Sequence, residues 1–321
     1  LGTHFFNPPR YLELLEIIPT PKTDPEVVDF FMHYGDRYLG KTTVLCKDTP
    51  AFIANRVGIF AIMDLFHKVG EMGLSVEDID KLTGPLIGRP KSATFRTADV
   101  VGLDTLIHVA NGLAHAVPHD EKQEVFKLPG FLQKMQENNW LGSKTGQGFY
   151  KKVKGEDGKS EILSLDLDTL EYTSQKRSKF ATLELTKTID DVRERWKVLI
   201  GGKDKAGEFY RRSVAGVMAY AANRIPEIAD DLFRIDQGMR AGFGWKHGPF
   251  EIWDAIGFEK GIKLIEAEGL SLAPWAKEMQ AAGHTSFYTV KEGQGYYYNI
   301  GDKSYQALPG GKSFIVLDHI R

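Results

Sequence analysis

The sequence has only one cysteine, Cys46, so no disulfide can form within the chain and the class of small disulfide-stapled secreted proteins is excluded. It has no surplus of either charge. Its 41 basic and 43 acidic residues give a formal net charge of −2, which argues against nucleic acid as a partner. No apolar run approaches the ~20 residues of a membrane-spanning helix, and the first residues do not resemble a signal peptide. We therefore expect a cytoplasmic protein without a membrane span.

Two nucleotide-binding patterns are missing or misplaced. The dinucleotide turn G-x-G-x-x-G occurs nowhere in the sequence. Residues 35–42, GDRYLGKT, match G-x-x-x-x-G-K-[ST], but a phosphate loop needs a strand before it and a helix after it. Here a helical pattern precedes and the β-branched segment TTVLCKD follows. We expect Gly35 and Gly40 to end a helix, and we reject a triphosphate site.

Helical patterns dominate the rest of the chain, and their start signals are clear. Asp24 and Pro25 are typical of the N-cap and first residue of a helix. Apolar residues at helical spacing predict a long buried helix over residues 51–72, and Ser75 with Asp78 predicts a capping box for the next one. One further helix is expected over residues 98–116.

Extended segments are fewer and shorter. THFFN and ELLEIIP flank Pro8-Pro9 near the start, while GYYYNI and SFIVLD are strand-like segments near the end. Residues 151–176 are polar and turn-rich, and they predict a linker between two domains.

An internal repeat divides the chain. Residues 52–106 resemble residues 209–262, and the matched positions lie 155 or 156 residues apart. This period far exceeds the ~20–50 residues of solenoid arrays, so it indicates two copies of one helical domain. We expect a pseudo-twofold pair in which each copy buries a face of the other. The matched residues are Ile79 and Ile235, Asp80 and Asp236, Gly88 and Gly244, Phe95 and Phe250, Asp99 and Asp254, and Gly102 and Gly257.

Four polar residues among apolar neighbours are candidates for chemistry: His4, Asn7, Glu16 and Asn55. Histidine is the usual proton acceptor at neutral pH. If THFFN and ELLEIIP pair, Glu16 returns beside His4, where a carboxylate would orient the imidazole and stabilise its charged form. The two asparagines could donate hydrogen bonds to a carbonyl or hydroxyl. The residues alone leave the alternative that His4 is a satisfied core histidine and that Glu16 faces water.

The tract G-T-H-F-F-N-P-P with L-L-E-I-I-P, followed by D-T-P-A-F-I-A-N-R, closely resembles the 3-hydroxyacyl-CoA dehydrogenase family of fatty-acid β-oxidation. The resemblance extends over essentially the whole chain and is strongest to the bacterial multifunctional type. It implies that His4 is the general base, that Glu16 orients it, and that Asn7 and Asn55 lie at the substrate. His4 would take the proton of an L-3-hydroxyacyl-CoA while a hydride passes to NAD.

The resemblance also implies a domain organisation. The fold is expected to be mainly α, a tandem pair of dehydrogenase C-terminal domains with a short β remnant of the NAD-binding Rossmann domain at the start. Residues 1–47 would end that domain, 48–150 form the first helical domain, 151–177 the linker, and 178–321 a structural second copy. No HFFNP tract precedes the second copy, and Arg211-Arg212-Ser213 stand at the position of its asparagine tract.

Further expectations concern what the chain binds. We expect a fragment that lacks the Rossmann domain, binds no NAD or metal by itself and is inactive alone, with acyl-CoA as the substrate of the intact enzyme. A hydratase domain is an expected companion in the parent protein. The alternatives are a short-chain 3-hydroxybutyryl-CoA dehydrogenase relative and a non-catalytic helical assembly module, in which Glu16→Gln would leave turnover unchanged.

Overall fold

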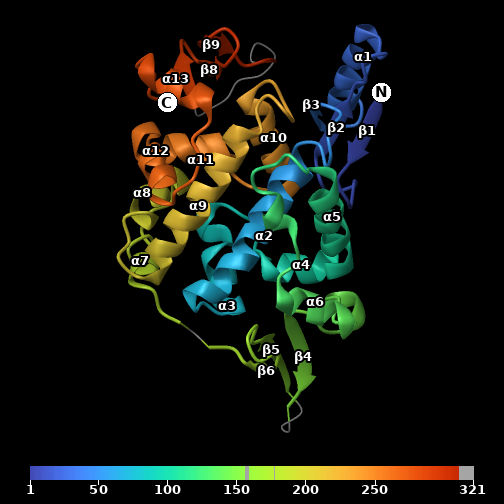
Figure 1. Cartoon of the computed structure of the whole chain (residues 1–321), viewed down its shortest axis with the longest axis vertical. Helices are drawn as coiled ribbons and strands as arrows, with labels where there is room; N and C mark the ends of the chain where they lie inside the picture. The colour runs from blue at the N-terminus through green and yellow to red at the C-terminus, as the bar shows by residue number, and fades with distance from the viewer. Residues whose placement is uncertain (156–158, 177, 311–321) are drawn as a thin grey trace. The chain divides into compact units, whose positions relative to one another are not determined.

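The computed structural model of the chain describes residues 1–155, 159–176 and 178–310. Helices form most of the regular structure, so the expectation of a mainly α fold is confirmed (Figure 1). The α-helices are α1 (Pro25–Arg37), α2 (Ala54–Met72), α3 (Val76–Leu82), α4 (Phe95–Val101), α5 (Leu103–Ala116), α6 (Gly130–Glu137), α7 (Ala181–Glu184), α8 (Val192–Leu199), α9 (Lys205–Asn223), α10 (Leu232–Phe243), α11 (Pro249–Ile256), α12 (Phe258–Ala267) and α13 (Pro274–Ala281). The strands are β1 (Gly2–Phe5), β2 (Leu14–Ile18), β3 (Thr42–Leu45), β4 (Tyr150–Lys154), β5 (Ser160–Leu165), β6 (Tyr172–Ser174), β7 (Tyr288–Lys291), β8 (Gln294–Asn299) and β9 (Ser304–Ala307).

The contacts divide the chain into two compact units. Unit 1 comprises residues 1–57 and 214–321, and unit 2 comprises residues 58–213. The chain passes from one unit to the other within α2 and returns within α9. This grouping differs from the four-part division expected from the sequence, which stays a prediction.

The first sheet of unit 1 has the order β1-β2-β3, with β1 antiparallel and β3 parallel to the central β2. All five residues of β2 are buried, as expected for a strand paired on both edges and covered on its faces. Helix α1 lies beside this sheet (Figure 1) and approaches it at Gly35, where an added Cβ would lie 2.9 Å from the Leu15 side chain. The two expected extended segments near the N-terminus are confirmed by β1 and β2.

The glycines of GDRYLGKT have different roles. Asp24 caps α1 by accepting a hydrogen bond from the Glu26 amide, as expected. Gly40 has a positive φ of 61° just after the helix. Gly35 does not end the helix, which corrects our expectation: it lies inside α1 because only a glycine fits against the sheet there. A helix precedes and a strand follows this segment, which is the reverse of a phosphate loop.

Unit 1 also contains the helices from α10 to α13 and the antiparallel sheet β7-β8-β9. Its core includes Phe250, Trp253 and Phe287. The ring centroid of Phe287 lies 5.1 Å from that of Phe250 and 5.0 Å from that of Trp253. Strand β8 confirms the expected extended segment GYYYNI. The other one, SFIVLD, lies outside the described residues.

Unit 2 is built around the remainder of α2. The ring centroids of Phe66 and Phe95 are 5.0 Å apart, and those of Phe95 and Phe149 are 4.5 Å apart. Ser75 and Asp78 form the expected capping box at α3. The single helix expected over residues 98–116 is wrong, because Gly102, with φ 100° and ψ 124°, separates α4 from α5.

The segment expected to be a linker contains regular structure. Strands β4, β5 and β6 form an antiparallel sheet, with Tyr150 opposite Ser164 and Leu165 opposite Tyr172. Polar residues dominate this sheet because much of its surface is exposed, which is why the sequence resembles a linker.

The repeat predicted from the sequence reappears as a repeated set of hydrogen bonds. In unit 2, Asp80 accepts from the amides of residues 94–96 and from the Tyr150 hydroxyl. In unit 1, Asp236 accepts from the amides of residues 250 and 251 and from the Tyr288 hydroxyl. In each unit, therefore, an aspartate, half-buried Asp80 or fully buried Asp236, ties the start of a helix to a tyrosine far along the chain.

Candidate active site

The first sheet places His4 directly opposite Glu16. Their Cα positions are partners in the antiparallel register, and His4 Nδ1 donates to Glu16 Oε2 at 2.7 Å. Glu16 has no exposed surface, whereas 32% of the His4 side chain is exposed. The expected pairing of the two extended segments therefore brings these side chains together, and the reading in which Glu16 faces water is wrong.

The other carboxylate oxygen of Glu16 is held by the start of α2. Oε1 accepts from the amides of Ile53 at 3.2 Å and Ala54 at 2.9 Å. The first amides of a helix lack partners within the helix, and the helix dipole favours negative charge at this end. A buried carboxylate without partners would be costly, so these three hydrogen bonds account for its location.

Two aromatic rings flank the imidazole. The ring centroids of Phe6 and Phe52 lie 5.4 Å and 5.5 Å from that of His4. Phe52 and the preceding Ala51 both have positive φ, 52° and 62°, in the turn that leads into α2. Because Nδ1 is bound to Glu16, Nε2 is the nitrogen left to exchange a proton, and it has no hydrogen-bond partner among the described residues.

The two asparagines lie on the segments that carry this pair. Asn7 follows β1 and is exposed, and Asn55 is the second residue of α2 and is partly buried. No contact of either side chain with His4 is observed in the described part of the chain. Their place at a substrate stays a prediction.

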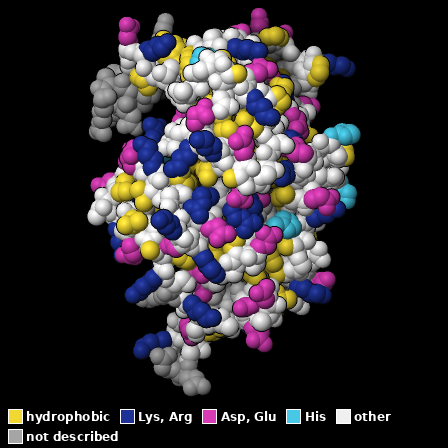
Figure 2. Space-filling view, turned by 60° about the vertical axis from the view of Figure 1, so that its left-hand side comes forward, with side chains coloured by type: hydrophobic (Ala, Val, Ile, Leu, Met, Phe, Trp, Pro, Cys, Tyr) yellow, Lys and Arg dark blue, Asp and Glu magenta, His cyan; other side chains and the backbone are white. Residues whose placement is uncertain are grey.

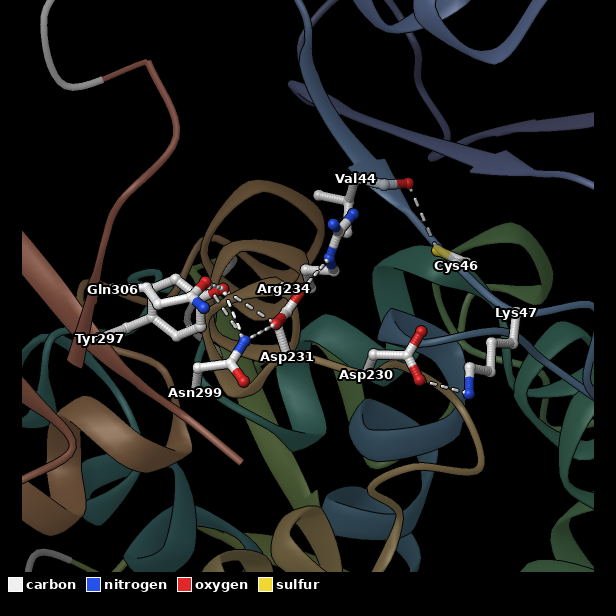
Figure 3. Close-up of polar contacts among 9 residues, drawn as sticks. All are labelled: Val44, Cys46, Lys47, Asp230, Asp231, Arg234, Tyr297, Asn299 and Gln306. Atoms are coloured by element: carbon white, nitrogen blue, oxygen red, sulfur yellow. Dashed lines mark hydrogen bonds and ion pairs between the residues drawn. The ribbon is translucent and has the colours of Figure 1, made fainter. Parts of the chain in front are cut away.

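Cys46 is a neighbour of the site that the sequence did not reveal. It continues β3, where its amide donates to the Ile17 carbonyl at 2.9 Å and its thiol points back toward the Val44 carbonyl (Figure 3). Burial, and then the nearby Glu16 carboxylate, raise the pKa of the Cys46 thiol far above its usual range. The thiol is therefore neutral and adds no second negative charge beside Glu16.

Helix α10 packs closely on β2 and on the turn that leads into α2. An added Cβ at Gly238 would lie 3.0 Å from Ile53 Cγ2, and one at Gly242 would lie 2.8 Å from Leu14 Cδ2. Phe243 stacks edge-on against Phe6, with centroids 5.6 Å apart. The small residues let α10 support both β2 and the start of α2, a role that sequence spacing did not suggest.

The segment before α10 is anchored at both ends (Figure 3). Lys47, which follows β3, forms an ion pair with Asp230 at 2.5 Å. Asp231, the N-cap residue of α10, accepts from Arg234 at 2.8 Å and from the Tyr297 hydroxyl on β8 at 3.0 Å. This arrangement fixes α10 against the strand that leads to the α2 turn.

Lys41, the lysine of GDRYLGKT, has a structural role in the same unit. Its ammonium donates to the Leu12 carbonyl at 2.9 Å and also to the Pro9 carbonyl. The lysine therefore holds the loop between β1 and β2, which carries Asn7. This use of the side chain supports the rejection of a triphosphate site.

Surface and composition add three observations. Basic and acidic side chains are interspersed on the face drawn in Figure 2, in keeping with the net charge of −2. Over residues 1–155, 159–176 and 178–310, no helix combines the length and apolar character needed to span a membrane. The same residues contain no group of three or more histidine, cysteine or acidic side chains arranged to hold a metal ion.

Comparison with known proteins identifies related sequences over the whole chain. Two family profiles match: the 3-hydroxyacyl-CoA dehydrogenase NAD binding domain over residues 1–49 and the C-terminal domain of the same family over residues 52–152. A probable 3-hydroxyacyl-CoA dehydrogenase of Bacillus subtilis is 45% identical over all 321 residues, which span 40% of that protein. A putative fatty acid oxidation complex trifunctional enzyme of Rickettsia prowazekii is 30% identical over 264 residues, covering 82% of this chain and 35% of the relative.

A solved structure shares the fold. The 3-hydroxybutyryl-CoA dehydrogenase of Escherichia coli K12 aligns over 88% of this chain and 70% of its own, with a TM-score of 0.61 at 20% identity. The expectation that the chain lacks the NAD-binding domain is wrong as stated, because residues 1–49, with β1 to β3 and α1, match that domain's profile. The chain spans well under half the length of the curated relatives described above. With both profiles matched in chain order around the His4–Glu16 pair, this chain belongs to the 3-hydroxyacyl-CoA dehydrogenase family.

Proposed function

We propose that this chain carries the proton-transfer centre of an NAD-dependent L-3-hydroxyacyl-CoA dehydrogenase of fatty-acid oxidation. The observation that carries the proposal is the 2.7 Å contact between the part-exposed His4 and the fully buried Glu16. A histidine oriented by a buried carboxylate, with its second nitrogen available, is the arrangement expected of a general base.

The chain's residues would act on the hydroxyl group of the substrate. His4 Nε2 accepts the proton of the 3-hydroxyl, the O–H electron pair becomes the second bond of the carbonyl, and a hydride leaves C3. In the intact enzyme, NAD would supply the chemistry of hydride acceptance at this point. Glu16 stabilises the imidazolium that forms, and we assign Asn7 and Asn55 to hydrogen bonds with the substrate oxygen.

The sequence contains no G-x-G-x-x-G turn, and this pattern is what presents backbone amides to a pyrophosphate. We therefore propose that these 321 residues by themselves bind no NAD and do not turn over. Isothermal titration with NAD and an assay of the isolated chain test this directly, and either saturable binding or turnover would contradict it.

We further propose that residues 178–321 are a structural second copy of the dehydrogenase C-terminal domain. Its support is the repeated Asp–Tyr hydrogen bond, made by Asp80 with Tyr150 and by Asp236 with Tyr288. The name of the Rickettsia relative, a trifunctional enzyme, supports a parent protein with further activities such as a hydratase. Pseudo-twofold pairing of the copies and a cytoplasmic location stay predictions.

The test of the central proposal is acetoacetyl-CoA reduction with NADH by the native gene product. His4→Ala should lower kcat by a factor on the order of 10² or more, because the general base is lost. His119→Ala is the matched control, since His119 is exposed on a turn of unit 2, and it should leave kcat unchanged. Equal activity of the two variants would refute His4 as the base.

Glu16→Gln separates an enzyme from an assembly module. Glutamine retains the size of the side chain but removes the negative charge that stabilises the imidazolium. We expect kcat to fall on the order of 10²-fold with KM changed far less, because the loss is confined to the transition state. Unchanged turnover would instead favour the assembly module.

A further inference from the structure

Arg56 is a fully buried charge in the first turn of α2, one residue after Asn55. Its Nε donates to the Tyr220 hydroxyl at 2.6 Å and its Nη2 to Glu227 Oε1 at 2.9 Å. Its Nη1 donates to the Pro50 carbonyl at 3.4 Å. The guanidinium therefore connects α2 with the end of α9, with the segment after it and with the turn that enters α2.

Burying an arginine is expensive, and a hydrophobic residue of similar volume would be as stable or more so. The charge is compensated by Glu227, whose other oxygen pairs with Arg224 at 2.7 Å. Glu227 is itself 38% exposed, so the pair is not a closed apolar core interaction. Stability alone thus gives a weak reason for arginine at this position, whereas its rigid fork suits the holding of several acceptors at once.

Arg56 contacts the turn of residues 50–54, which leads into α2 and binds Glu16. Its own amide donates to the Ala51 carbonyl at 3.2 Å, and Ala51 and Phe52 both have positive φ. Such residues cost free energy and persist only where their surroundings determine them. The next two amides, of Ile53 and Ala54, are the ones that bind Glu16.

We propose that Arg56 is a positioning residue of the dehydrogenase reaction, clamping residues 50–54 so that their amides bind Glu16 and the Phe52 ring packs on His4. The inference rests on the proposed function of His4 and Glu16. It predicts that loosening the clamp misplaces the base without removing any group that touches the substrate. A misplacement on the order of 1 Å can cost about 10²-fold in rate.

The test compares three variants. Arg56→Lys keeps the charge but replaces the fork by one ammonium, which cannot reach Tyr220, Glu227 and Pro50 together. Tyr220→Phe removes one acceptor and retains the buried ring. Arg224→Lys is the matched control, because Arg224 is also buried, pairs with the other oxygen of Glu227 and lies over the Tyr220 ring, while the substitution leaves the contacts of Arg56 with the Pro50 and Ala51 carbonyls in place.

Two readouts are needed. Hydrogen exchange of peptides covering residues 49–56, measured on the 321-residue chain, reports the turn without any need for turnover. Kinetics with acetoacetyl-CoA, measured on the native gene product, report its effect on the base. We expect Arg56→Lys to speed hydrogen exchange of this segment about tenfold and to lower kcat about 10²-fold, with KM within about threefold of the wild-type value. Tyr220→Phe should change exchange and kcat in the same direction to a smaller extent. Arg224→Lys should change neither exchange nor kcat.

The outcomes distinguish this inference from the proposed function. If His4→Ala abolishes turnover but Arg56→Lys behaves like Arg224→Lys in both readouts, the clamp is refuted and the function stands. If His4→Ala retains turnover, the proposed function fails, whatever the exchange data show. Should Arg56→Lys not fold, Tyr220→Phe decides: wild-type exchange and kcat in that variant overturn the proposal.

Discussion

Ala51 and Phe52 show how single residues define this site. Both are non-glycine residues in the left-handed region of φ, and they directly precede the two amides that bind Glu16. An alanine side chain disfavours this conformation by roughly 1 kcal/mol relative to glycine. The turn therefore stores strain beside the proposed general base, where the surrounding contacts hold it.

Ala51→Gly should relieve part of that strain. We expect the free energy of unfolding to rise by about 0.5–1 kcal/mol, because glycine adopts a φ of 62° without a steric cost. Urea unfolding followed by circular dichroism measures the change. Ala281→Gly at the exposed end of α13 is the control and should lower stability, since glycine is a poor helix former. A less stable Ala51→Gly variant would show that Ala51 is not strained.

The sequence predicted some of these residues and not others, for a physical reason. His4 and Glu16 lie on adjacent short strands twelve residues apart, so local pairing was enough to bring them together. Arg56 binds Tyr220 and Glu227, 164 and 171 residues away, and such contacts depend on how distant segments pack. From the sequence, Cys46 served only to exclude a disulfide within the chain, and its place near Glu16 follows from its position directly after β3.

At the scale of elements, the sequence predicted where helices begin more reliably than where a helical pattern is interrupted. The caps at Asp24 and Ser75 are local hydrogen bonds between neighbouring residues, so the sequence revealed both. The break at Gly102 was missed because the helical pattern continues across it, and the strands of residues 150–174 were missed because they are polar. Gly35 is glycine because of its packing on the sheet, which a pattern of spacing does not show.

Asp99 links two elements of unit 2 and makes their stability depend on pH. This residue of α4 accepts from the Phe149 amide at 2.8 Å and the Tyr150 amide at 2.9 Å at the start of β4. Burial raises the pKa of Asp99 to about 6, and the two amides only partly offset it. In the unfolded chain an aspartate has a pKa of about 3.9.

The sign of the pH effect follows from these pKa values. Between about pH 4 and pH 6 the folded state retains the proton on Asp99 and the unfolded state releases it, so the free energy of unfolding falls as pH rises. Asp99→Asn cannot titrate. We expect the stability of the wild type relative to this variant to fall by on the order of 2 kcal/mol over that interval, measured by urea unfolding at several pH values.

The control for this titration is Asp104→Asn. The Asp104 side chain is 46% exposed, and its hydrogen bond with Lys144 lowers the pKa of its carboxyl. Its contribution is therefore complete above about pH 4 and is lost only in stronger acid, so the stability difference should be flat from pH 4 to pH 6. Parallel curves for wild type and Asp99→Asn in the same interval would contradict the raised pKa of Asp99.

At the scale of the whole molecule, the two units repeat one design with different neighbours. Asp99 and Asp254 both bind two successive amides at the start of a strand, and Gly102 and Gly257 have nearly the same φ, 100° and 102°. Only unit 1 adds the His4–Glu16 pair, which belongs to the segment matched by the NAD binding domain profile. The repeat was visible in the sequence because these aspartates and glycines serve the backbone, whereas the support that α10 gives to the site was not.

The repeat makes a quantitative prediction that involves both units. The Tyr150 hydroxyl donates to Asp80 at 2.8 Å and the Tyr288 hydroxyl to Asp236 at 2.6 Å. Burial raises the pKa of both carboxyls, and the tyrosine hydrogen bond opposes this. Tyr150→Phe and Tyr288→Phe should each lower the free energy of unfolding by about 1–3 kcal/mol, because each leaves a carboxylate, half-buried in Asp80 and fully buried in Asp236, with one partner fewer.

The two substitutions share no partner, so the double variant should lose the sum of the two effects to within about 0.5 kcal/mol. Tyr38→Phe, at a residue that is 72% exposed, is the control and should change stability by less than about 0.5 kcal/mol. Neither tyrosine contacts His4 or Glu16 among the described residues, so kcat of the native gene product should stay at the wild-type value in all three variants. A stability loss in only one of Tyr150→Phe and Tyr288→Phe would show that the copies share a sequence pattern but not the energetic role of the Asp–Tyr hydrogen bond.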